Sequence, residues 1–398
     1  MIIGISFLVF ACTMITIEQK AEKIHDEIVS IDTHSDTPLN FLEPDFDIGK
    51  WNNFDSTHTR IDFPRMKAGR LDAAFMAVFI GQGERSEAGN AKAKQRALDI
   101  FDALHKKISL YPDQAQIAYK SNDVYNIKKD GKSTVYIGVE NGYPIGNDLN
   151  NIKEFYDLGA RYITLSHTRN NDICDSSTDK KGPEYNGLSE FGEEVVKEMN
   201  RLGMIIDVSH ISDSAYYDVL KLSKTPIIAS HSSVRAICDN PRNFDDDMLY
   251  ALKENGGVIQ ICILSDYIKT PPPYPERDSA FQALRVKWNY WQDLSEEEYK
   301  QGSKEWRALQ IKYPKELATV ADAVDHIDYV VKTIGVDYVG IGTDFDGGGG
   351  LKDCRDASEM KNITIELLRR GYTKEEIKKI WGENFLRVFR EVEKKAFI

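Results

Sequence analysis

The chain has 398 residues, of which 41% are hydrophobic and 29% are charged, a composition typical of a globular enzyme. This length fits either one large barrel or two medium-sized domains. The net charge of −12 argues against binding to nucleic acid or to anionic lipid through bulk charge, so an anionic substrate would need basic residues fixed near it.

The N-terminal residues, MIIGISFLVFACTMITIEQK, begin with an apolar stretch of signal-peptide length. Within it, FLVFAC is similar to the cleavage box of a bacterial lipoprotein, which would make Cys12 the lipidated residue. No Lys or Arg precedes the apolar run and Phe10 is bulky for its position, so the alternatives are a frayed apolar leader or a start codon placed too late. We expect residues 1–20 to be a leader that directs export, with a periplasmic or membrane-anchored product, and residues 21–398 to form one catalytic domain.

The rest of the chain lacks two other patterns. It has no run of about 18 apolar residues, which excludes an internal membrane span. The remaining cysteines are widely spaced and none forms a C-x-x-C, which excludes a zinc-ribbon pattern and leaves the presence of disulfides open. These four are Cys174, Cys238, Cys262 and Cys354.

Short apolar segments of strand type alternate with helical patterns along the chain. The predicted strands are 28–34, 71–80, 134–140, 162–167, 203–210, 226–231, 256–264 and 338–347. The predicted helices include 193–203, 214–223, 245–256 and 320–335, and several of them stop at a Gly after a basic last turn. Near-continuous apolar strands that alternate with helices indicate parallel strands buried on both faces, and eight of them indicate a single-domain α/β fold of the (β/α)8 barrel type.

Two further segments stand outside this alternation. Residues 373–389 open with Thr373 and Glu376 at capping-box spacing and predict a long terminal amphipathic helix. Residues 265–316 are too many for an ordinary connection between a strand and a helix. Because this insertion follows the seventh strand, on the side where barrels carry their active sites, we expect it to be a lid or a dimer contact.

Six of the eight predicted strands end in an ionisable residue. These residues are His34 with Asp36, Glu140, His167, His210, His231 and Asp344. Barrel enzymes collect their chemistry at the C-terminal ends of the strands, so we expect all of them to converge on one mouth. The chain has only eight histidines, and the four outside this set fall in helical or loop contexts, where a solvated or core histidine is the simpler interpretation. Those four are His25, His58, His105 and His326.

The residues at the strand ends suit two metal ions. The imidazoles of His34, His210 and His231 with the carboxylates of Asp36 and Glu140 match zinc or a similar divalent ion, since harder ions prefer more oxygen ligands. Glu140 is the natural bridge, because a carboxylate has two oxygens. His34, Asp36 and Glu140 would then bind one ion. Glu140, His210 and His231 would bind the other, and the reaction class would be hydrolysis by an activated water.

The motifs around these residues resemble the membrane dipeptidases, also called renal dipeptidases, which are zinc-dependent members of the amidohydrolase superfamily. The resemblance runs from about residue 25 to the end, through DTHSD, GVENG, RYITLSHTRNN, GLSEFGEEVVKEMNRLGMIIDVSHIS, IIASHSSVRAICDNPRN and GIGTDFDGG. It implies cleavage of dipeptides, with two zinc ions held by His34, Asp36, bridging Glu140, His210 and His231. It also implies that His167, Arg242 and Asp344 contact the dipeptide, that C-terminal residues of D configuration are tolerated, and that the protein is a homodimer.

Because Asp344 ends the eighth strand beside the proposed activated water, we expect it to carry protons, and we expect His167, at the same mouth, to stabilise the oxygen of the tetrahedral intermediate. The chain departs from the family at GVENGYPI, where a glutamate-glycine-glycine-histidine pattern is commoner, and at Arg169, where animal members have a cysteine. Two alternatives remain open. One is a related dizinc amidohydrolase acting on another small amide or lactone, although the common enzymes of that kind use a lysine bridge. The other is a catalytically inactive barrel kept as a binding protein.

Overall fold

One parallel sheet forms the centre of the structure, a computed structural model that describes residues 15–43, 45–291 and 294–397. Its strands run in the order β1-β2-β4-β5-β6-β7-β8-β9, and the short β3 pairs with β4. The bounds are β1 Ile31–Ser35, β2 Ala73–Phe79, β3 Ala115–Ile117, β4 Ser133–Glu140, β5 Ala160–Thr164, β6 Ile205–Asp207, β7 Ile228–Ser232, β8 Val258–Cys262 and β9 Val339–Gly342. Backbone hydrogen bonds from Asp344 N to His34 O (3.0 Å) and from Asp36 N to Phe345 O (2.9 Å) join the last strand to the first. The predicted single-domain (β/α)8 barrel is therefore confirmed, as a nearly closed barrel.

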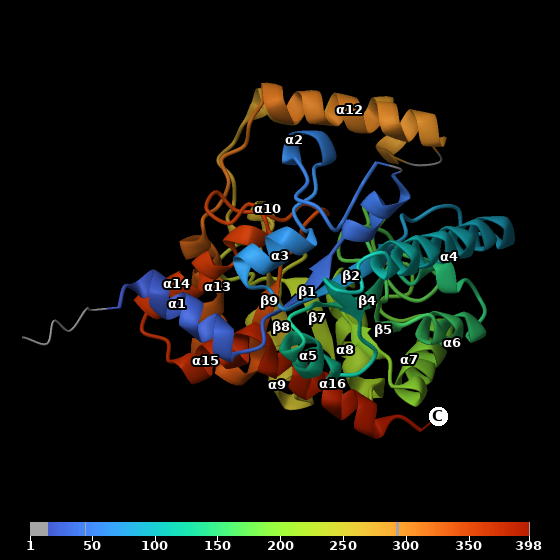
Figure 1. The fold of residues 1–398 in the computed structure, drawn as a ribbon. Coiled ribbons are helices and arrows are strands. Elements are labelled where there is room, and N and C mark those ends of the chain that lie inside the picture. The colour runs from blue at the N-terminus through green and yellow to red at the C-terminus, as the bar shows by residue number, and fades with distance from the viewer. Residues whose placement is uncertain (1–14, 44, 292–293, 398) are drawn as a thin grey trace, which may run out of the picture.

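Helices surround the barrel on its outer side (Figure 1). Their bounds are α1 Ile17–Glu27, α2 Phe54–Thr57, α3 Phe63–Gly69, α4 Glu87–Ser109, α5 Asp123–Lys129, α6 Asn150–Asp157, α7 Glu190–Leu202, α8 Asp213–Leu222, α9 Asp246–Asn255, α10 Ser265–Ile268, α11 Pro275–Lys287, α12 Glu296–Lys312, α13 Val320–Thr333, α14 Lys361–Arg369, α15 Lys374–Lys378 and α16 Asn384–Lys395. As predicted, α7 and α9 end at glycines in the left-handed conformation, Gly203 (φ 74°) and Gly256 (φ 79°). Each of these two helices also begins with a side-chain cap, from Ser189 and Asp245 respectively.

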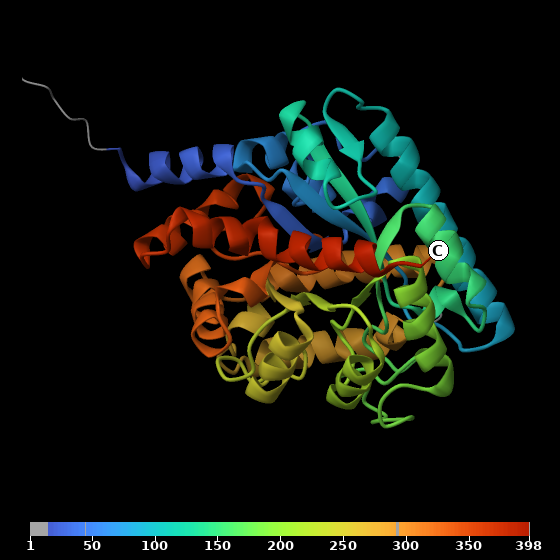
Figure 2. The ribbon, with the colours of Figure 1, turned by 90° about the horizontal axis from the view of Figure 1, so that it is seen from below.

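The lower end of the barrel is closed by aromatic side chains and by helix α16, which lies across that end in Figure 2. Phe75 stacks on Tyr136 and Tyr162 inside the barrel, with ring centroids 4.8 and 5.2 Å apart. Phe385 and Phe389 of α16 meet these rings edge-on from below. This plug keeps water out of the lower barrel, so polar groups placed above it are open only toward the upper end.

The terminal helix differs from the single regular helix predicted for 373–389. The capping box of Thr373 and Glu376 is present, but a π-helical turn over Lys379–Glu383 separates α15 from α16. Any side chain at Gly382 would crowd the backbone oxygen of Val29, and Asn384 donates to the carbonyl oxygens of Val336 (2.6 Å) and Val339 (2.8 Å). A π-helical turn holds one residue more than an α-helical turn, and here it coincides with close packing against the barrel. The helical repeat in the sequence does not reveal that packing.

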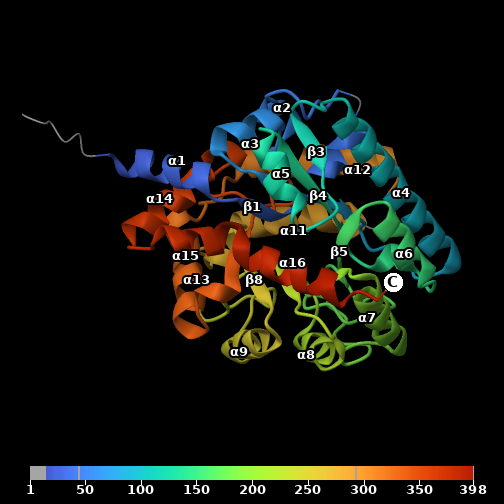
Figure 3. The same cartoon turned by 60° about the horizontal axis from the view of Figure 1, so that its bottom comes forward.

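The described part of the insertion at 265–316 contains three α-helices and lies at the upper end of the barrel. Helix α10 follows β8, the seventh strand of the barrel, and α11 and α12 pack on one another. Figure 1 shows α12 at the top of the molecule, on the side opposite α16, and Figure 3 shows α11 and α12 from another angle. The prediction that the insertion stands on the mouth side is confirmed, while a role as a lid or dimer contact stays a prediction.

The predicted leader, including Cys12, falls almost entirely outside the described residues; only its last residues, 15–20, are described, and 17–20 begin α1. Among the residues that are described, none of the helices combines the length and the apolar run needed to cross a bilayer. The four other cysteines are buried and unpaired, so within this part of the chain there is no disulfide.

Candidate metal centre

Alternation along β4 brings Glu140 into the barrel. Tyr136, Gly138 and Glu140 are two residues apart, so their side chains share the inward face of the strand. Tyr136 belongs to the aromatic plug, and the site of the missing side chain at Gly138 is filled by the ring of Tyr162. Glu140, the last residue of β4, therefore stands one layer above the plug and is 2% exposed.

The other predicted metal-ligating and catalytic residues reach the same layer from five further strands or strand ends. His34 lies in β1 with Asp36 directly after it, and His231 lies in β7. His167, His210 and Asp344 lie two or three residues beyond the ends of β5, β6 and β9. His210 (φ 72°) and Asp344 (φ 56°) adopt the left-handed conformation, which is uncommon for residues other than glycine and clusters at functional sites.

Glu140 is the hub of this cluster. Its Oε1 atom lies 3.1 Å from Nε2 of His210 and 3.4 Å from Nε2 of His231. The same oxygen is 3.6 Å from Nε2 of His167, and Oε2 is 3.5 Å from Nε2 of His34. Four imidazoles from four strands or strand ends thus face one carboxylate. The structure therefore brings these residues together at one point, as predicted.

The cluster has the donor set and the unmet valences of a metal site. Three groups of side chains hold their ligand atoms within 4.8 Å of one another: His34, Glu140 and His231; Glu140, His167 and His210; and His34, Asp36 and Asp344. Nε2 of His34 and Oδ1 of Asp36 are buried without a hydrogen-bond partner, which is costly unless a cation takes that place. Nitrogen and carboxylate donors suit zinc or a similar divalent ion. The residues present therefore fit a metal. These three groups differ from the two predicted ligand sets, namely His34, Asp36 and Glu140 for one ion and Glu140, His210 and His231 for the other, and one of the groups includes His167.

Burial makes the charged forms of this cluster unfavourable when no cation compensates them. It raises the pKa of Glu140 to about 8. Burial, together with the negative charge of Glu140, raises the pKa of Asp36 well above its usual range. Burial, together with the negative charge of Asp36, likewise raises the pKa of Asp344. Burial lowers the pKa of His167 to about 3 and lowers the pKa values of His210 and His231 well below their usual range. A divalent cation would reverse the penalty on the carboxylates and requires the neutral imidazoles that burial already favours.

Two histidines are held from behind by hydrogen bonds on the ring nitrogen that faces away from Glu140. Nδ1 of His34 lies 2.8 Å from the hydroxyl oxygen of Tyr162. Nδ1 of His231 lies 2.8 Å from Oγ of Ser230, and that hydroxyl donates to Oδ2 of Asp207 at 2.6 Å. Such partners fix the orientation and tautomer of a ligating histidine and leave Nε2 free for a metal.

Asp207 has two roles in this part of the barrel. Its carboxylate accepts from the backbone N–H groups of Ser209 (3.0 Å) and Ser230 (2.8 Å), which ties β6 to β7. It also accepts from the Ser230 hydroxyl behind His231, so it both organises the strands and orients this ring.

Arg242 places a positive charge beside the cluster, where, after burial, it also lowers the pKa values of His167, His210 and His231. Its side chain is buried, donates to the carbonyl oxygen of His231 at 3.0 Å, and keeps an Nε atom without a partner. The other arginine of the same loop, Arg235, is instead engaged by Asp213, to which it donates two hydrogen bonds of 2.8 Å. The guanidinium of Arg242 is thus the one in this loop that retains an unused donor at the site.

Sequence reasoning missed Tyr162 and Asn141. Tyr162 belongs to a predicted strand, but its partner His34 is 128 positions away, so only the barrel register shows the contact. Asn141 follows Glu140 in the left-handed conformation (φ 76°) and donates to Ile80 O at 2.8 Å. The sequence did carry a signal for Asn141, because GVENGYPI has Asn where the commoner family pattern has Gly after the glutamate. Asn tolerates the left-handed conformation better than most residues other than glycine.

Three histidines outside the cluster have structural roles, as predicted. His326 joins Val234 N and Ile268 O in the core, and His105 faces the carbonyl oxygen of Leu158. His25 lies 2.7 Å from Thr364 Oγ1 through its Nε2 atom. The fourth, His58, lines a large cavity above the cluster.

Comparisons with known proteins agree with this fold and indicate a family. The family model described as membrane dipeptidase (peptidase family M19) matches residues 18–397. Dipeptidase tcpJ of Claviceps purpurea is 33% identical over 338 residues, covering 84% of this chain and 69% of the relative. Dipeptidase verJ of Clonostachys rogersoniana is 32% identical over 387 residues, 94% of this chain and 87% of the relative. The crystal structure of the probable dipeptidase PvdM from Pseudomonas aeruginosa superposes with a TM-score of 0.83 at 31% identity, covering 96% of this chain and 99% of that one.

Proposed function

Because the chain belongs to the membrane dipeptidase family, peptidase family M19, we propose that it hydrolyses the single peptide bond of dipeptides with two zinc ions that share Glu140. The observation that carries the proposal is the convergence of imidazoles and carboxylates on Glu140, with unpartnered atoms on His34 and Asp36. The proposed ligands are His34, Asp36, Glu140, His210 and His231. When bound, the ions supply an activated water and polarise the carbonyl of the scissile bond.

In this proposal Asp344 moves protons. Its carboxylate belongs to the same group as the imidazole of His34 and the carboxylate of Asp36, so it borders the place where the water would be activated. It takes the proton of the attacking water on a carboxylate oxygen and gives it to the leaving nitrogen. Peptide cleavage needs this transfer, because an amide anion is a very poor leaving group.

His167 is proposed to donate a hydrogen bond to the carbonyl oxygen as it becomes anionic. Its side chain is 20% exposed, whereas that of His210 is 6% exposed. Among the imidazoles around Glu140 it is therefore the one most open to the mouth of the barrel. This exposure favours contact with the substrate over a role as metal ligand, which its place in a candidate metal group would also allow.

Arg242 is proposed to bind the free carboxylate of the dipeptide. A guanidinium holds a carboxylate through parallel hydrogen bonds, which fixes geometry as well as charge. Its burial beside His231 and its unused Nε donor support this role. Because this recognition reads the carboxylate rather than the configuration of the residue, we extend the proposal to dipeptides with D-configured C-terminal residues.

Two further parts of the proposal concern the chain as a whole. We propose that the protein is exported, with a lipid on Cys12, and that it forms a homodimer, as the family resemblance implies. Mass spectrometry of the mature N-terminus and light scattering of the purified protein test these two parts separately from the enzymatic activity.

The test of the proposed function is a panel of dipeptides with L- or D-configured C-terminal residues, each also prepared as the C-terminal amide. We expect the free dipeptides to be cleaved, the chelated protein to be inactive, and zinc to restore cleavage. Amidation should cost the wild type far more than it costs Arg242→Ala. Cleavage that survives removal of metal contradicts the metal-dependent mechanism, and equal cleavage of amidated substrates favours the broader amidohydrolase alternative.

A further inference from the structure

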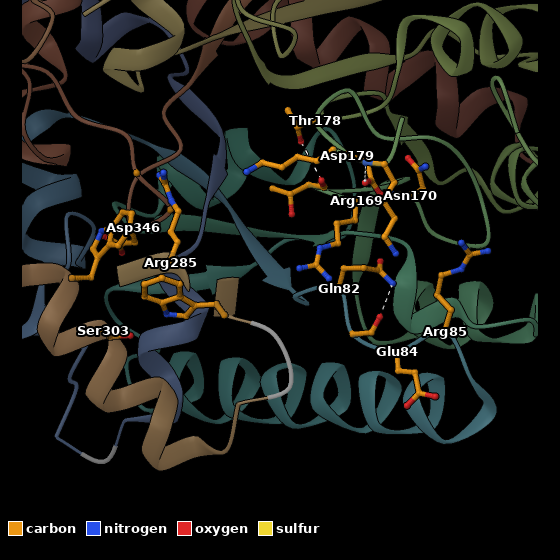
Figure 4. Close-up of a pocket in the computed structure, with 18 of the residues that line it drawn as sticks. Gln82, Glu84, Arg85, Arg169, Asn170, Thr178, Asp179, Arg285, Ser303 and Asp346 are labelled. Atoms are coloured by element: carbon orange, nitrogen blue, oxygen red, sulfur yellow. Dashed lines mark hydrogen bonds between the residues drawn. The ribbon is translucent and has the colours of Figure 1, made fainter. Parts of the chain in front are cut away.

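A cavity of about 1660 Å³ lies over the candidate metal centre. It reaches the centre at Thr168, next to His167, and at Gly347, where a side chain would overlap the carboxylates of Asp36 and Asp344. Figure 4 shows Gln82 and Arg169 on one side of the cavity and Arg285 and Ser303 on the other. The second side is built by the insertion, because Arg285 belongs to α11 and Ser303 to α12.

This cavity is larger than a simple dipeptide requires. Pockets for drug-sized ligands enclose roughly 300–1,000 Å³, and a dipeptide of small residues is smaller than such a ligand. Arg242, the proposed partner of the C-terminal carboxylate, is not among the lining residues. The cavity therefore has room for a part of the substrate other than that carboxylate, namely a side chain or a group attached to it.

The lining is basic although the chain as a whole is acidic. Seven of the lining residues are cations: Arg60, Arg85, Arg169, Lys180, Lys181, Arg285 and Arg307. Four are carboxylates: Glu84, Asp179, Glu184 and Asp346. In a protein of net charge −12, this local excess of positive charge focuses a positive potential into the cavity.

Most of the lining carboxylates are already used by the protein itself. Glu184 pairs with Arg85 at 2.5 Å. Asp179 accepts from the backbone N–H groups of Asn170 (2.9 Å) and Lys181 (2.8 Å). Asp346 likewise accepts from the N–H of Arg60 and from the hydroxyls of Thr37 and Thr59. These three carboxylates therefore have little capacity left to neutralise the cations that face the cavity.

Several of the cations, in contrast, have no acidic partner in the described part of the chain. Arg169, which follows His167 by two residues, forms no ion pair there, and neither do Lys181 and Arg307. Arg285 stacks over the ring of Trp306 at 5.3 Å instead of pairing with a carboxylate. Cations that face a cavity from two opposite walls without counter-ions are arranged to receive an anionic group.

We propose that the preferred substrates are dipeptides whose side chain carries a negative charge, which the cavity cations Arg169, Lys181, Arg285 and Arg307 bind. This inference rests on the proposed function and adds a substrate class to it. The anion would come from outside the protein, as an acidic side chain or as an acidic group attached to a side chain, and longer acidic chains would reach the cations on α11 and α12.

The test compares acidic dipeptides with their uncharged amides. Aspartyl, glutamyl and 2-aminoadipyl residues, and the corresponding side-chain amides, are each joined to alanine in both orders, and kcat/KM is measured for every member. We expect the acid of at least one pair to exceed its amide by about tenfold at low salt, and the ratio to shrink at about 0.5 M NaCl because salt screens exposed charges. Arg169→Gln and Arg307→Gln should each lower the acid-to-amide ratio about threefold, the usual worth of a partly exposed ion pair.

Lys304→Gln is the matched control, because this exposed lysine lies on α12 close to Arg307 in sequence but does not line the cavity. It should keep the wild-type ratio. Acid-to-amide ratios near one in the wild type, or equal losses in Lys304→Gln and Arg307→Gln, overturn the inference while leaving the dipeptidase proposal intact. If no dipeptide is cleaved, the proposed function is wrong instead, and calorimetric binding of the same pairs then decides whether the cavity prefers the acids.

Discussion

At the scale of single residues, the hydroxyl of Tyr162 connects the apolar plug to the candidate metal centre. Its ring stacks on Phe75 in the plug, while its oxygen lies 2.8 Å from Nδ1 of His34. A ligating histidine is usually oriented by such a partner, and loss of the partner typically weakens metal binding 10–100-fold. Tyr162 is thus a positioning residue for His34.

Tyr162→Phe should keep the packing of the plug and lower the affinity for zinc by roughly tenfold or more. Competition with a metallochromic chelator measures this affinity directly. Tyr136→Phe is the matched control, because this buried tyrosine also belongs to the plug but its hydroxyl donates to Lys120 O at 2.9 Å, away from the centre. Equal affinities in the two variants would remove Tyr162 from the support of His34.

The proposed proton carrier gives a second test at this scale. Asp344→Asn preserves the shape of the side chain and removes its ability to accept a proton. Turnover of a dipeptide should fall by about 10²–10⁴, the usual worth of a positioned acid–base group, while the zinc content measured on the same sample stays close to that of the wild type. Near-normal turnover in this variant would exclude Asp344 from the mechanism.

His25 provides a pH-dependent prediction far from the centre. Burial lowers the pKa of His25 to about 4, and the neutral ring sits between Thr364 and the carbonyl oxygen of Arg70. The unfolded chain binds a proton here below a pH of about 6.5 and the folded protein does not, so this contribution to stability is complete above that pH and is lost as the pH falls toward 4.

Between pH 6.5 and pH 4.5, the free energy of unfolding of the wild type should therefore fall more steeply than that of His25→Gln. The difference in slope is at most about 1.4 kcal/mol per pH unit, which corresponds to one proton. Denaturant titrations at several pH values measure it. Parallel pH profiles for the two proteins would contradict the assignment of a neutral buried His25.

The types of the site residues could be predicted from the sequence, but their partners could not. Glu140 and the histidines of the cluster can be recognised in the sequence because each lies at or near the end of an apolar segment. Ser230 and Tyr162 carry no such signal, since a serine or tyrosine in a strand is ordinary. Their roles depend on which residue the barrel curvature sets opposite them, and that is a property of the register between strands.

At the scale of elements, the turn after β9 shows how backbone geometry shapes the centre. Asp344 and Asp346 both adopt the left-handed conformation, and the chain then passes Gly347 directly against the carboxylates of Asp36 and Asp344. A side chain at 347 would overlap both of them. The glycine thus allows the turn to pack against the site while leaving it open to the cavity.

Gly347→Ala should therefore displace these carboxylates and reduce dipeptide turnover by at least about tenfold, because small misplacements of catalytic groups are costly. Gly81→Ala is a suitable control, since a methyl group there meets nothing within 4 Å. Initial rates and thermal unfolding are measured together for both variants. Full activity of Gly347→Ala would show that the turn does not constrain the site.

The existence and order of the barrel strands followed from the sequence, whereas their ends did not. The apolar pattern predicts strands that run to His167 and His210, but β5 ends at Thr164 and β6 at Asp207. At His210 the backbone turns left-handed, which an apolar run cannot signal. The three-residue β3 was missed because one exposed and one partly exposed residue leave no clear apolar segment.

At the scale of the whole molecule, the chain is layered along the barrel axis. Helix α16 lies at the lower end and helix α12 of the insertion at the upper end (Figure 1). The aromatic plug closes the lower end, the candidate metal centre lies above the plug, and the basic cavity opens above the centre. The sequence could predict the barrel and that the insertion stands at the mouth. It could not predict the cavity, because α11 and α12 form one of its walls through contacts between segments far apart in the chain.

The central claim is that this cluster holds two divalent ions that share Glu140, and metal content tests it most directly. Zinc per chain is measured by elemental analysis on wild type and on Glu140→Gln after identical zinc loading and dialysis. We predict close to two ions in the wild type and a loss at both sites in the variant, because each ion depends on the same carboxylate. A Glu140→Gln protein that retains the full wild-type zinc content would contradict the account.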